Sequence, residues 1–364
     1  MGFAREQPPA VSGTVRALRR ARILPFPSPP AQAAPWEEFR RVLPLVKLYP
    51  RKLAPLRHLP KVAVLMCTMQ GQRFLAEQLN SIATQSHPHW EIWASDDGSD
   101  DHTHAILEYY QAHWGRERIS IHAGPAEGST ANFLSLSCRA DIDADYFAYA
   151  DQDDVWEADK LERAVQWLET VPRHVPALYG SRTLLVDERN QHIGYSQLFT
   201  RDPDFRNALV QSVAGGNTMV FNRAARDLLR RAGEDVEAIT HDWWAYMLVT
   251  GAGGRVHYDP HPTVRYRQHG CNQFGANISL RAQARRAAEL LRGRFRHWVD
   301  ANLRALMRVR HLMTPENQRI LDEFAAARQR RLPGRLWGLH RAGVYRQTRL
   351  GNLGLALAAL IDRL

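Results

Sequence analysis

Three carboxylates within four positions, Asp151-Gln-Asp-Asp154, are the residues of this sequence best suited to chemistry. They follow a short aromatic run, 146–150, whose length and composition predict a buried strand. Carboxylates crowded at the end of a strand repel one another unless a cation lies among them. Oxygen ligands of this kind suit Mg²⁺ or Mn²⁺, which usually shares its coordination shell with phosphate oxygens. An exposed acidic start to the following helix, favoured by the helix dipole, explains the same residues without a metal.

The chain before this segment alternates between strands and helices. Apolar or β-prone runs predict strands at 62–67, 90–95 and 119–122, and helical spacing predicts helices at 72–84, 101–113 and 130–138. Such alternation predicts a mostly parallel, Rossmann-like α/β sheet with helices on both faces. Ligands bind beyond the carboxyl ends of the strands in sheets of this kind. Cys67-Thr68 and Asp96-Asp97 stand at two further strand ends, so three ends carry candidates for one site.

The second half of the chain is less regular. We expect a strand at 177–187, a loop at 194–212, a short strand to about 221 and a helix to about 231. A helix follows from 241 to 249, then strands at 254–258 and 263–267, and a loop at 268–272. No internal repeat is evident.

Composition places the chain among globular proteins, with 364 residues, 45% apolar and 24% charged. No run of about 18 apolar residues predicts a membrane-spanning helix. The basic N-terminus lacks an apolar segment followed by a cleavage site, so we expect no secretion signal. Cys67, Cys138 and Cys271 are few and widely spaced, which indicates buried thiols in a reducing compartment.

Charge divides the chain into three parts. Net charge is +8 over residues 1–58, −10 over 59–280 and +12 over 281–364. We therefore expect a basic, partly disordered N-terminal extension, a central α/β domain and a helical, basic C-terminal extension. The acidic centre argues against nucleic-acid binding, and the basic flanks suit an anionic surface such as a membrane. The alternative is that the arginine-rich flanks only increase solubility.

The last segment of the chain combines this positive charge with apolar residues at helical spacing. The apolar positions are Leu350, Leu353, Leu357, Leu360, Ile361 and Leu364. A stripe of this kind suits a helix lying at a membrane interface. Packing of the same helix on the central domain, or on a second subunit in a homodimer, remains open as an alternative.

Six motifs in order carry a resemblance to a known family. They are Cys67-Thr-Met-Gln-Gly71, Asp96-Asp-Gly-Ser99, Asp151-Gln-Asp-Asp-Val-Trp156, Gly215-Gly-Asn217, His241-Asp-Trp-Trp244 and Tyr266-Arg-Gln-His-Gly-Cys-Asn272. Over about residues 61–275 the chain resembles the inverting GT-A-fold glycosyltransferases of family 2, in the bacterial rhamnosyltransferase-like branch. Members of this branch commonly begin with Ala-Thr-Tyr-Asn-Gly. The differences at the first motif affect the expected base preference more than the chemistry.

The resemblance implies a reaction in which an acceptor hydroxyl attacks the anomeric carbon of a nucleotide sugar and a nucleoside diphosphate leaves. A divalent ion, Mg²⁺ or Mn²⁺, would stabilise the charge on the leaving group. Asp153 and His269 are then the expected metal ligands, and Asp151 would contact the ribose or the metal's shell. Arg267 would contact phosphate, with an ordinary surface arginine as the alternative. Asp154 would cap the following helix.

The nucleotide side of the site is implied at the earlier strand ends. Asp97 would accept a hydrogen bond from the base or the ribose, with a turn built on Asp-Gly as the alternative. The backbone around Cys67 and Thr68 would pack along the base. Gly216 would let the backbone approach the donor sugar closely.

The acceptor side is implied around the motif at 241–244. An inverting displacement needs a base for the acceptor hydroxyl, and Asp242 fits that role. The alternative for Asp242 is a helix N-cap. Trp243 or Trp244 would stack on an acceptor sugar, while one of the two belongs to the core.

These implications together predict transfer of L-rhamnose from dTDP-L-rhamnose to a lipid-linked or growing surface polysaccharide, of O-antigen or capsule type. The protein would be cytoplasmic and peripheral on the inner face of the bacterial plasma membrane. One alternative is a UDP-hexose-dependent enzyme of the same fold. A second is a non-catalytic, glycan-binding scaffold, and a third, weaker one is nucleic-acid binding through the arginine-rich ends.

Overall fold

The computed structural model of the protein describes residues 36–46, 59–270 and 293–364. Most of the predicted N-terminal extension and the predicted thiol at Cys271 therefore lie outside the described part. Within that extension the structure describes residues 36–46, which include α1 (Trp36–Val42).

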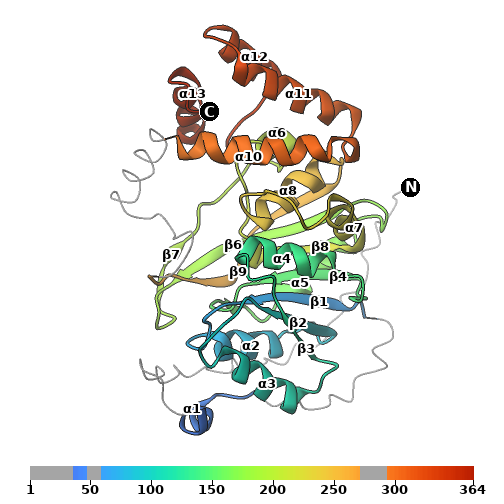
Figure 1. The fold of residues 1–364 in the computed structure, drawn as a ribbon, viewed down its shortest axis with the longest axis vertical. Helices are drawn as coiled ribbons and strands as arrows, with labels where there is room; N and C mark the ends of the chain where they lie inside the picture. The colour runs from blue at the N-terminus through green and yellow to red at the C-terminus, as the bar shows by residue number, and fades with distance from the viewer. Residues whose placement is uncertain (1–35, 47–58, 271–292) are drawn as a thin grey trace, which may run out of the picture.

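The centre of the molecule is one nine-stranded sheet, in the order β3-β2-β1-β4-β8-β6-β9-β5, with β7 paired to β6 (Figure 1). Its first four strands are parallel and confirm the predicted alternation. They are β1 (Val62–Thr68), β2 (Trp90–Asp96), β3 (Ile119–Ala123) and β4 (Tyr146–Ala150). The helices that follow or connect them are α2 (Leu75–Ala83), α3 (Thr103–Trp114), α4 (Ser129–Cys138) and α5 (Lys160–Leu168).

The other half of the sheet is mixed. Its strands are β5 (Val155–Trp156), β6 (Ala177–Val186), β7 (His192–Tyr195), β8 (Val220–Asn222) and β9 (Arg255–Arg267). Short β8 is antiparallel to both β4 and β6, and it joins the two halves. The predicted loop at 194–212 instead contains the end of β7 and the helix α6 (Phe205–Ala208).

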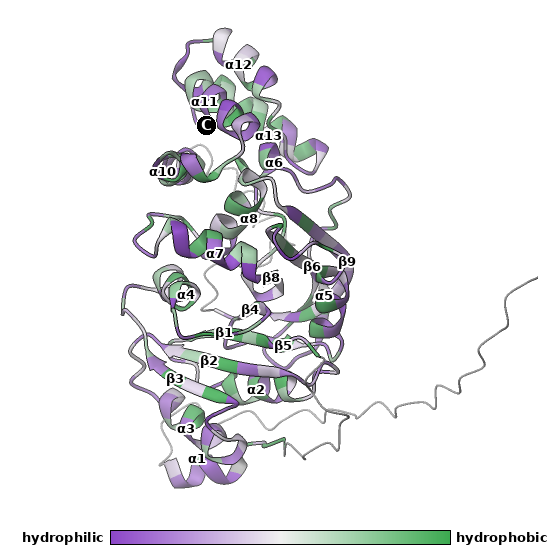
Figure 2. Ribbon diagram, turned by 90° about the vertical axis from the view of Figure 1, so that its right-hand side faces the viewer, coloured by the Kyte–Doolittle hydropathy of each residue, from purple (hydrophilic) through white to green (hydrophobic). Residues whose placement is uncertain are grey.

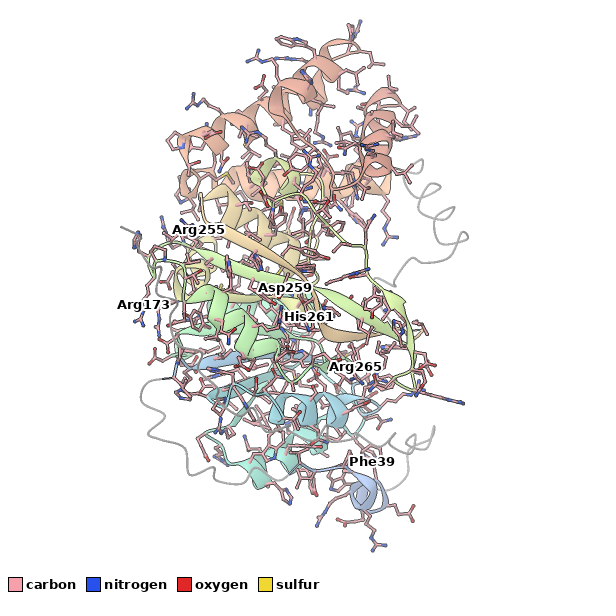
Figure 3. All side chains as sticks on the ribbon, turned by 180° about the vertical axis from the view of Figure 1, so that it is seen from behind. Phe39, Arg173, Arg255, Asp259, His261 and Arg265 are labelled. Carbon is pink, nitrogen blue, oxygen red and sulfur yellow. The ribbon has the colours of Figure 1, made fainter. Side chains whose placement is uncertain are left out.

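Two predicted strands, 254–258 and 263–267, are one continuous strand, β9, which Figure 3 follows from Arg255 through Asp259 and His261 to Arg265. The prediction divided it because prolines, here Pro260 and Pro262, cannot donate to a strand partner. In the structure they fall where the pairing of β9 with β6 shifts register. The bulge there lets the strand accommodate both prolines.

Alternate residues of β1 face two hydrophobic cores, which is why all seven of its residues are buried. One core lies under α2, α3 and α5, and the other lies under α4, α7 (Arg223–Ala232) and α8 (His241–Gly251). Figure 2 shows α4 and α7 on one side of β1 and α2 on the other. The mostly parallel α/β sheet expected from the sequence is thus confirmed.

The C-terminal helices extend the second of these cores. They are α10 (Arg294–Arg308), α11 (Pro315–Gln329), α12 (Gly334–Ala342) and α13 (Arg349–Leu360). They stack beyond α6 and α8 (Figure 2), and buried residues of all four belong to the same cluster as α8. Within the part of the chain that the structure describes, no helix is long and apolar enough to cross a membrane.

Candidate active site

The carboxyl ends of three parallel strands meet at one edge of the sheet, as predicted. Thr68 of β1 is level with Asp96 of β2, while β4 ends level with Met66, so Asp151 continues beside Cys67. Burial raises the pKa of the Cys67 thiol well above its usual value, and the charges of Asp151 and Asp97 raise it further. The thiol is therefore neutral, and it lies between the two acidic strand ends.

The two aspartates at the end of β2 both accept hydrogen bonds from nearby segments. Asp96 accepts hydrogen bonds from the hydroxyls of Thr68 and Ser99, each at 2.7 Å. Asp97 accepts from the backbone N–H groups of Ala126 at 2.8 Å and Gly128 at 2.9 Å. Asp97 thus fixes the loop that leads into α4, and the lone pairs that remain on its oxygens are what a ribose or base could use.

The Asp151–Asp154 turn sends its side chains in different directions. The amide of Gln152 brackets the backbone of Met69, accepting from its N–H at 2.9 Å and donating to its carbonyl at 2.7 Å. Asp154 is fully buried and accepts from the Asn217 amide and, at 3.1 Å, from the Arg267 N–H. The predicted helix-capping role of Asp154 is wrong, because α5 begins only at Lys160. Asp154 instead connects three segments of the fold.

Asp153 and His269 come together from positions 116 residues apart. The Nε2 atom of His269 lies 2.7 Å from Oδ2 of Asp153, and both side chains are mostly buried. A carboxylate oxygen and an imidazole nitrogen are both ligands for Mn²⁺ and related ions. Among the described residues, no group of three or more His, Cys, Asp or Glu side chains is arranged to hold a metal. Any ion here would take its other ligands from phosphate and water.

Acidic side chains crowd around this pair. Burial, followed by repulsion from Asp153 and Asp242, raises the pKa of Asp151 to about 8. Burial also raises the pKa of Asp154 well above its usual value, with Asp153 and Asp151 adding to the effect. Since Asp242 acts on Asp151, the acid that follows β4 and the acid at the start of α8 share one acidic region. A cation bound among them would relieve this repulsion.

Asp242 faces the glycine turn before β8. Its Oδ2 accepts from the Gly216 N–H at 3.1 Å, and its Oδ1 accepts from the Trp243 N–H at 2.7 Å. Asp242 is not the N-cap of α8, because Thr240 occupies that position. Its carboxylate is only partly buried, so it is accessible from the site.

Gly216 is required by close packing. A Cβ atom at this position would lie 2.4 Å from Nε2 of His241 and 3.4 Å from Cβ of Asp242. The His241 ring is stacked on Phe133 at 3.9 Å and has no room to withdraw. Burial lowers the pKa of His241 to about 4, so this ring is neutral. The sequence analysis assigned no role to His241, although it precedes the candidate base.

Three predicted contacts are corrected by burial. Arg267 is 1% exposed and donates to the carbonyls of Asp153 and Glu188 at 2.8 and 3.0 Å. It also pairs with Glu77, so its guanidinium is bonded to groups of the protein and is not exposed for the predicted phosphate contact. Trp243 and Trp244 are 7% and 0% exposed. The core around α8 takes both rings, and neither can stack on an acceptor sugar.

Other supporting residues escaped the sequence analysis. Gln152 lies inside the acidic motif, but its pairing with Met69 depends on a contact between distant segments. Buried Lys160 donates to the Thr218 carbonyl at 3.2 Å and lies over the Trp156 ring. Burial lowers the pKa of Lys160 to about 7, against an opposing effect of Asp154. A lysine at the start of a helix normally points to solvent, so the sequence carried no signal for this one.

Comparison with known proteins finds relatives in sequence and in structure. The dTDP-rhamnosyl transferase RfbG of Shigella flexneri is 29% identical over 234 residues, covering 61% of this chain and 77% of that protein. The UDP-Glc:alpha-D-GlcNAc-diphosphoundecaprenol beta-1,3-glucosyltransferase WfgD of Escherichia coli is 23% identical over 129 residues, covering 34% and 46%. Among solved structures, S. aureus TarS 1–349 in complex with UDP is 14% identical with a TM-score of 0.48, covering 83% and 88%.

A family model also matches the chain directly. Residues 63–229, from β1 into α7, match the model described as Glycosyl transferase family 2. This region contains the three strand ends of the site and the Gly215-Gly216 turn. Asp242 and His269 come from the elements that immediately follow it. The part of the chain from residue 63 to residue 229 is therefore similar to glycosyltransferases of family 2.

Proposed function

We propose that the protein is a metal-dependent, inverting glycosyltransferase that transfers L-rhamnose from dTDP-L-rhamnose to a hydroxyl of a lipid-linked or growing surface glycan. The observation that carries the proposal is the contact between Asp153 and His269. Their Oδ2 and Nε2 atoms lie 2.7 Å apart, next to the acidic region that contains Asp151 and Asp242. A scaffold without catalytic activity has no need of this group, because mutual repulsion among the acids destabilises the fold.

The donor assignment rests on the relative with the broadest coverage. RfbG is named a dTDP-rhamnosyl transferase, and the alignment spans 77% of its length. The shorter match to WfgD, whose name specifies a UDP-glucose donor, supports a UDP-hexose as the second candidate. The residues that would distinguish the two bases lie around Cys67, Thr68 and Asp97, at the ends of β1 and β2.

The residues present fit a divalent ion. Asp153 and His269 would hold it, with Asp151 beside them in its outer shell. When bound, the ion would neutralise charge on the diphosphate leaving group. Arg267 contributes indirectly, because its hydrogen bond to the Asp153 carbonyl fixes the backbone that carries the ligand.

Asp242 performs the proton transfer in this proposal. The acceptor oxygen forms a bond to the anomeric carbon from the face opposite the diphosphate, while the bond from that carbon to the diphosphate oxygen breaks. The acceptor proton passes to Oδ1 or Oδ2 of Asp242, and the electron pair of the broken bond leaves with the nucleoside diphosphate. The Gly216 N–H, which donates to Asp242, orients the carboxylate toward the acceptor side.

Donor hydrolysis in the absence of acceptor tests the proposal. Purified protein is incubated with dTDP-L-rhamnose, UDP-glucose and UDP-N-acetylglucosamine, each with Mn²⁺, with Mg²⁺ or with EDTA, and nucleotide release is measured. We expect release from dTDP-L-rhamnose with either metal and none with EDTA. A clear preference for a UDP-hexose would overturn the rhamnose assignment. Equal rates with metal and with EDTA would overturn the metal dependence.

A further inference from the structure

Helix α13 exposes a row of large aliphatic side chains at the end of the chain. Leu350 is 81% exposed and Leu353 is 67% exposed, values that a packed leucine does not reach. The other members are Leu357 and Leu360, each 48% exposed, and Ile361, 39% exposed. At helical spacing the five fall within an arc of about 100°. We call these five residues the leucine stripe.

The stripe is not needed for folding of the helix onto the protein. The opposite side of α13 already packs into the core through Leu355, Ala358 and Ala359. Leu364, which the sequence grouped with the stripe, is also buried. The helix is therefore apolar on two sides. Within the described part of the molecule, only one of these sides packs against other residues.

The charge around the stripe discriminates between partners. Residues 293–364 contain 14 arginines and no lysine against five acidic residues, a net charge of +9. Within α13 itself the only charged residue is Arg349. Arg349 and Arg363 are exposed. Helical spacing places Arg349 beside the stripe, and Arg363 follows the end of the helix. A second copy of this region would bring equal positive charge against it, whereas an anionic lipid surface complements both the arginines and the aliphatic side chains.

We propose that the leucine stripe docks α13 in the plane of an anionic lipid surface. A helix of 12 residues is about 18 Å long, which is too short to span a bilayer but suits an interfacial position. The leucines enter the boundary between headgroups and acyl chains, and the flanking arginines contact lipid phosphates. This inference does not depend on which sugar the active site transfers, although it explains how a lipid-linked acceptor is reached.

Co-sedimentation of the full chain with vesicles tests the inference. We expect binding to phosphatidylglycerol vesicles, weaker binding to phosphatidylcholine vesicles, and a decrease in binding as salt concentration rises. The double variant Leu353→Ser, Leu357→Ser should bind phosphatidylglycerol at least about tenfold more weakly. Because both side chains are largely exposed, its thermal unfolding and its donor hydrolysis in solution should match the unsubstituted protein. Those two measurements separate failure of this inference from failure of the proposed activity.

The matched control is Ile193→Ser, Leu198→Ser, which removes two residues that are 47% and 43% exposed in and after β7. This control should retain full vesicle binding. Unchanged binding by the α13 variant, or equal loss in the control, would overturn the inference. So would a dimer in solution that the α13 substitutions convert to a monomer, because the stripe would then be covered by a second copy.

Discussion

Two acidic sites lie along β9, one in its middle and one just beyond its end. In the first, Asp259 accepts hydrogen bonds from Arg163 at 2.8 and 3.0 Å and from the Tyr179 hydroxyl at 2.6 Å. In the second, Asp153 meets His269, with Asp151 and Asp242 nearby. Figure 3 shows Asp259 and His261 of the first group from behind the molecule.

The two groups differ in the direction of their pKa shifts. Burial alone would raise the pKa of Asp259, but hydrogen bonds from Tyr179, from the His261 N–H and from Arg163 lower it below its usual value. Burial and neighbouring acids raise the pKa of Asp151 to about 8. The fold places hydrogen-bond donors and the Arg163 cation beside Asp259. At the strand ends it instead places several acids close together. The first group stabilises the protein, and in our proposal the second group binds a ligand that brings positive charge.

Removing the candidate base should produce the largest effect on activity. We expect Asp242→Asn to reduce the rate of sugar transfer from donor to acceptor by about 10³-fold, because an amide cannot take the acceptor proton. Dissociation constants for dTDP and UDP with Mn²⁺, measured by calorimetry, should change little. Unchanged turnover in this variant would refute the assignment of Asp242, and Asp259→Asn serves as the comparison that removes a buried carboxylate elsewhere.

Gly216→Ala should have the next largest effect. The added Cβ would lie 2.4 Å from Nε2 of His241, so the glycine turn or the histidine must move, and the hydrogen bond from Gly216 to Asp242 moves with it. We expect turnover to fall by about 10²-fold, since small displacements of catalytic groups are costly. The control is Gly270→Ala, because a Cβ atom at Gly270 would have open space around it. Gly98→Ala is unsuitable because Gly98 has a positive φ, which alanine rarely adopts. A wild-type rate for Gly216→Ala would contradict this account.

In the first group the expected effect is on stability. Asp259→Asn should lower the free energy of unfolding by about 2 kcal/mol, because Arg163 and Tyr179 lose an ionised partner. The value is below that of a fully buried pair since the Arg163 side chain is 37% exposed and solvent screens it. Urea unfolding measures this loss of stability. The matched control is Glu157→Gln, which removes the ion pair with Arg265, because the Glu157 carboxylate is more exposed than that of Asp259. An equal loss in both variants would show that burial of Asp259 adds nothing.

The smallest effect concerns pH. The unfolded chain loses the Asp151 proton near pH 4, but the folded protein retains it to about pH 8. The contribution of this proton to stability is therefore fully present below pH 4 and is lost as pH rises to 8. Asp151→Asn should have a melting temperature that exceeds the wild-type value by a few degrees at pH 8 in EDTA, and by less at pH 5. A difference that does not change with pH would contradict the raised pKa.

The sequence predicted the parallel half of the sheet well because each strand there is a short, continuous apolar run followed by an acid or a glycine turn. It predicted Asp153 and His269 as partners only through the family resemblance, since 116 residues separate them. It divided β9 at two prolines because the register shift that accommodates them depends on β6. The helical spacing of the apolar residues predicted the leucine stripe, but it did not predict that Leu364 is buried.

The residues that were misassigned have one feature in common. Arg267, Trp243 and Trp244 stand next to residues of the site, and their chemical types suit a ligand as well as they suit a core. Their partners come from elsewhere in the chain: Glu77 for Arg267, 190 positions away, and the Ala208 carbonyl for the Trp243 indole N–H. No local pattern encodes such contacts.

The sequence by itself determined which chemical groups stand at the ends of the strands, because strand length and residue type are local properties. Only the tertiary structure decided which of those groups remain available to a ligand. Asp259 and Asp153 have the same side chain, and packing covers most of each. Asp259 is surrounded by donors from α5 and β6, whereas Asp153 lies beside His269 and near Asp151 and Asp154. This difference arises from which distant elements the fold brings beside each one.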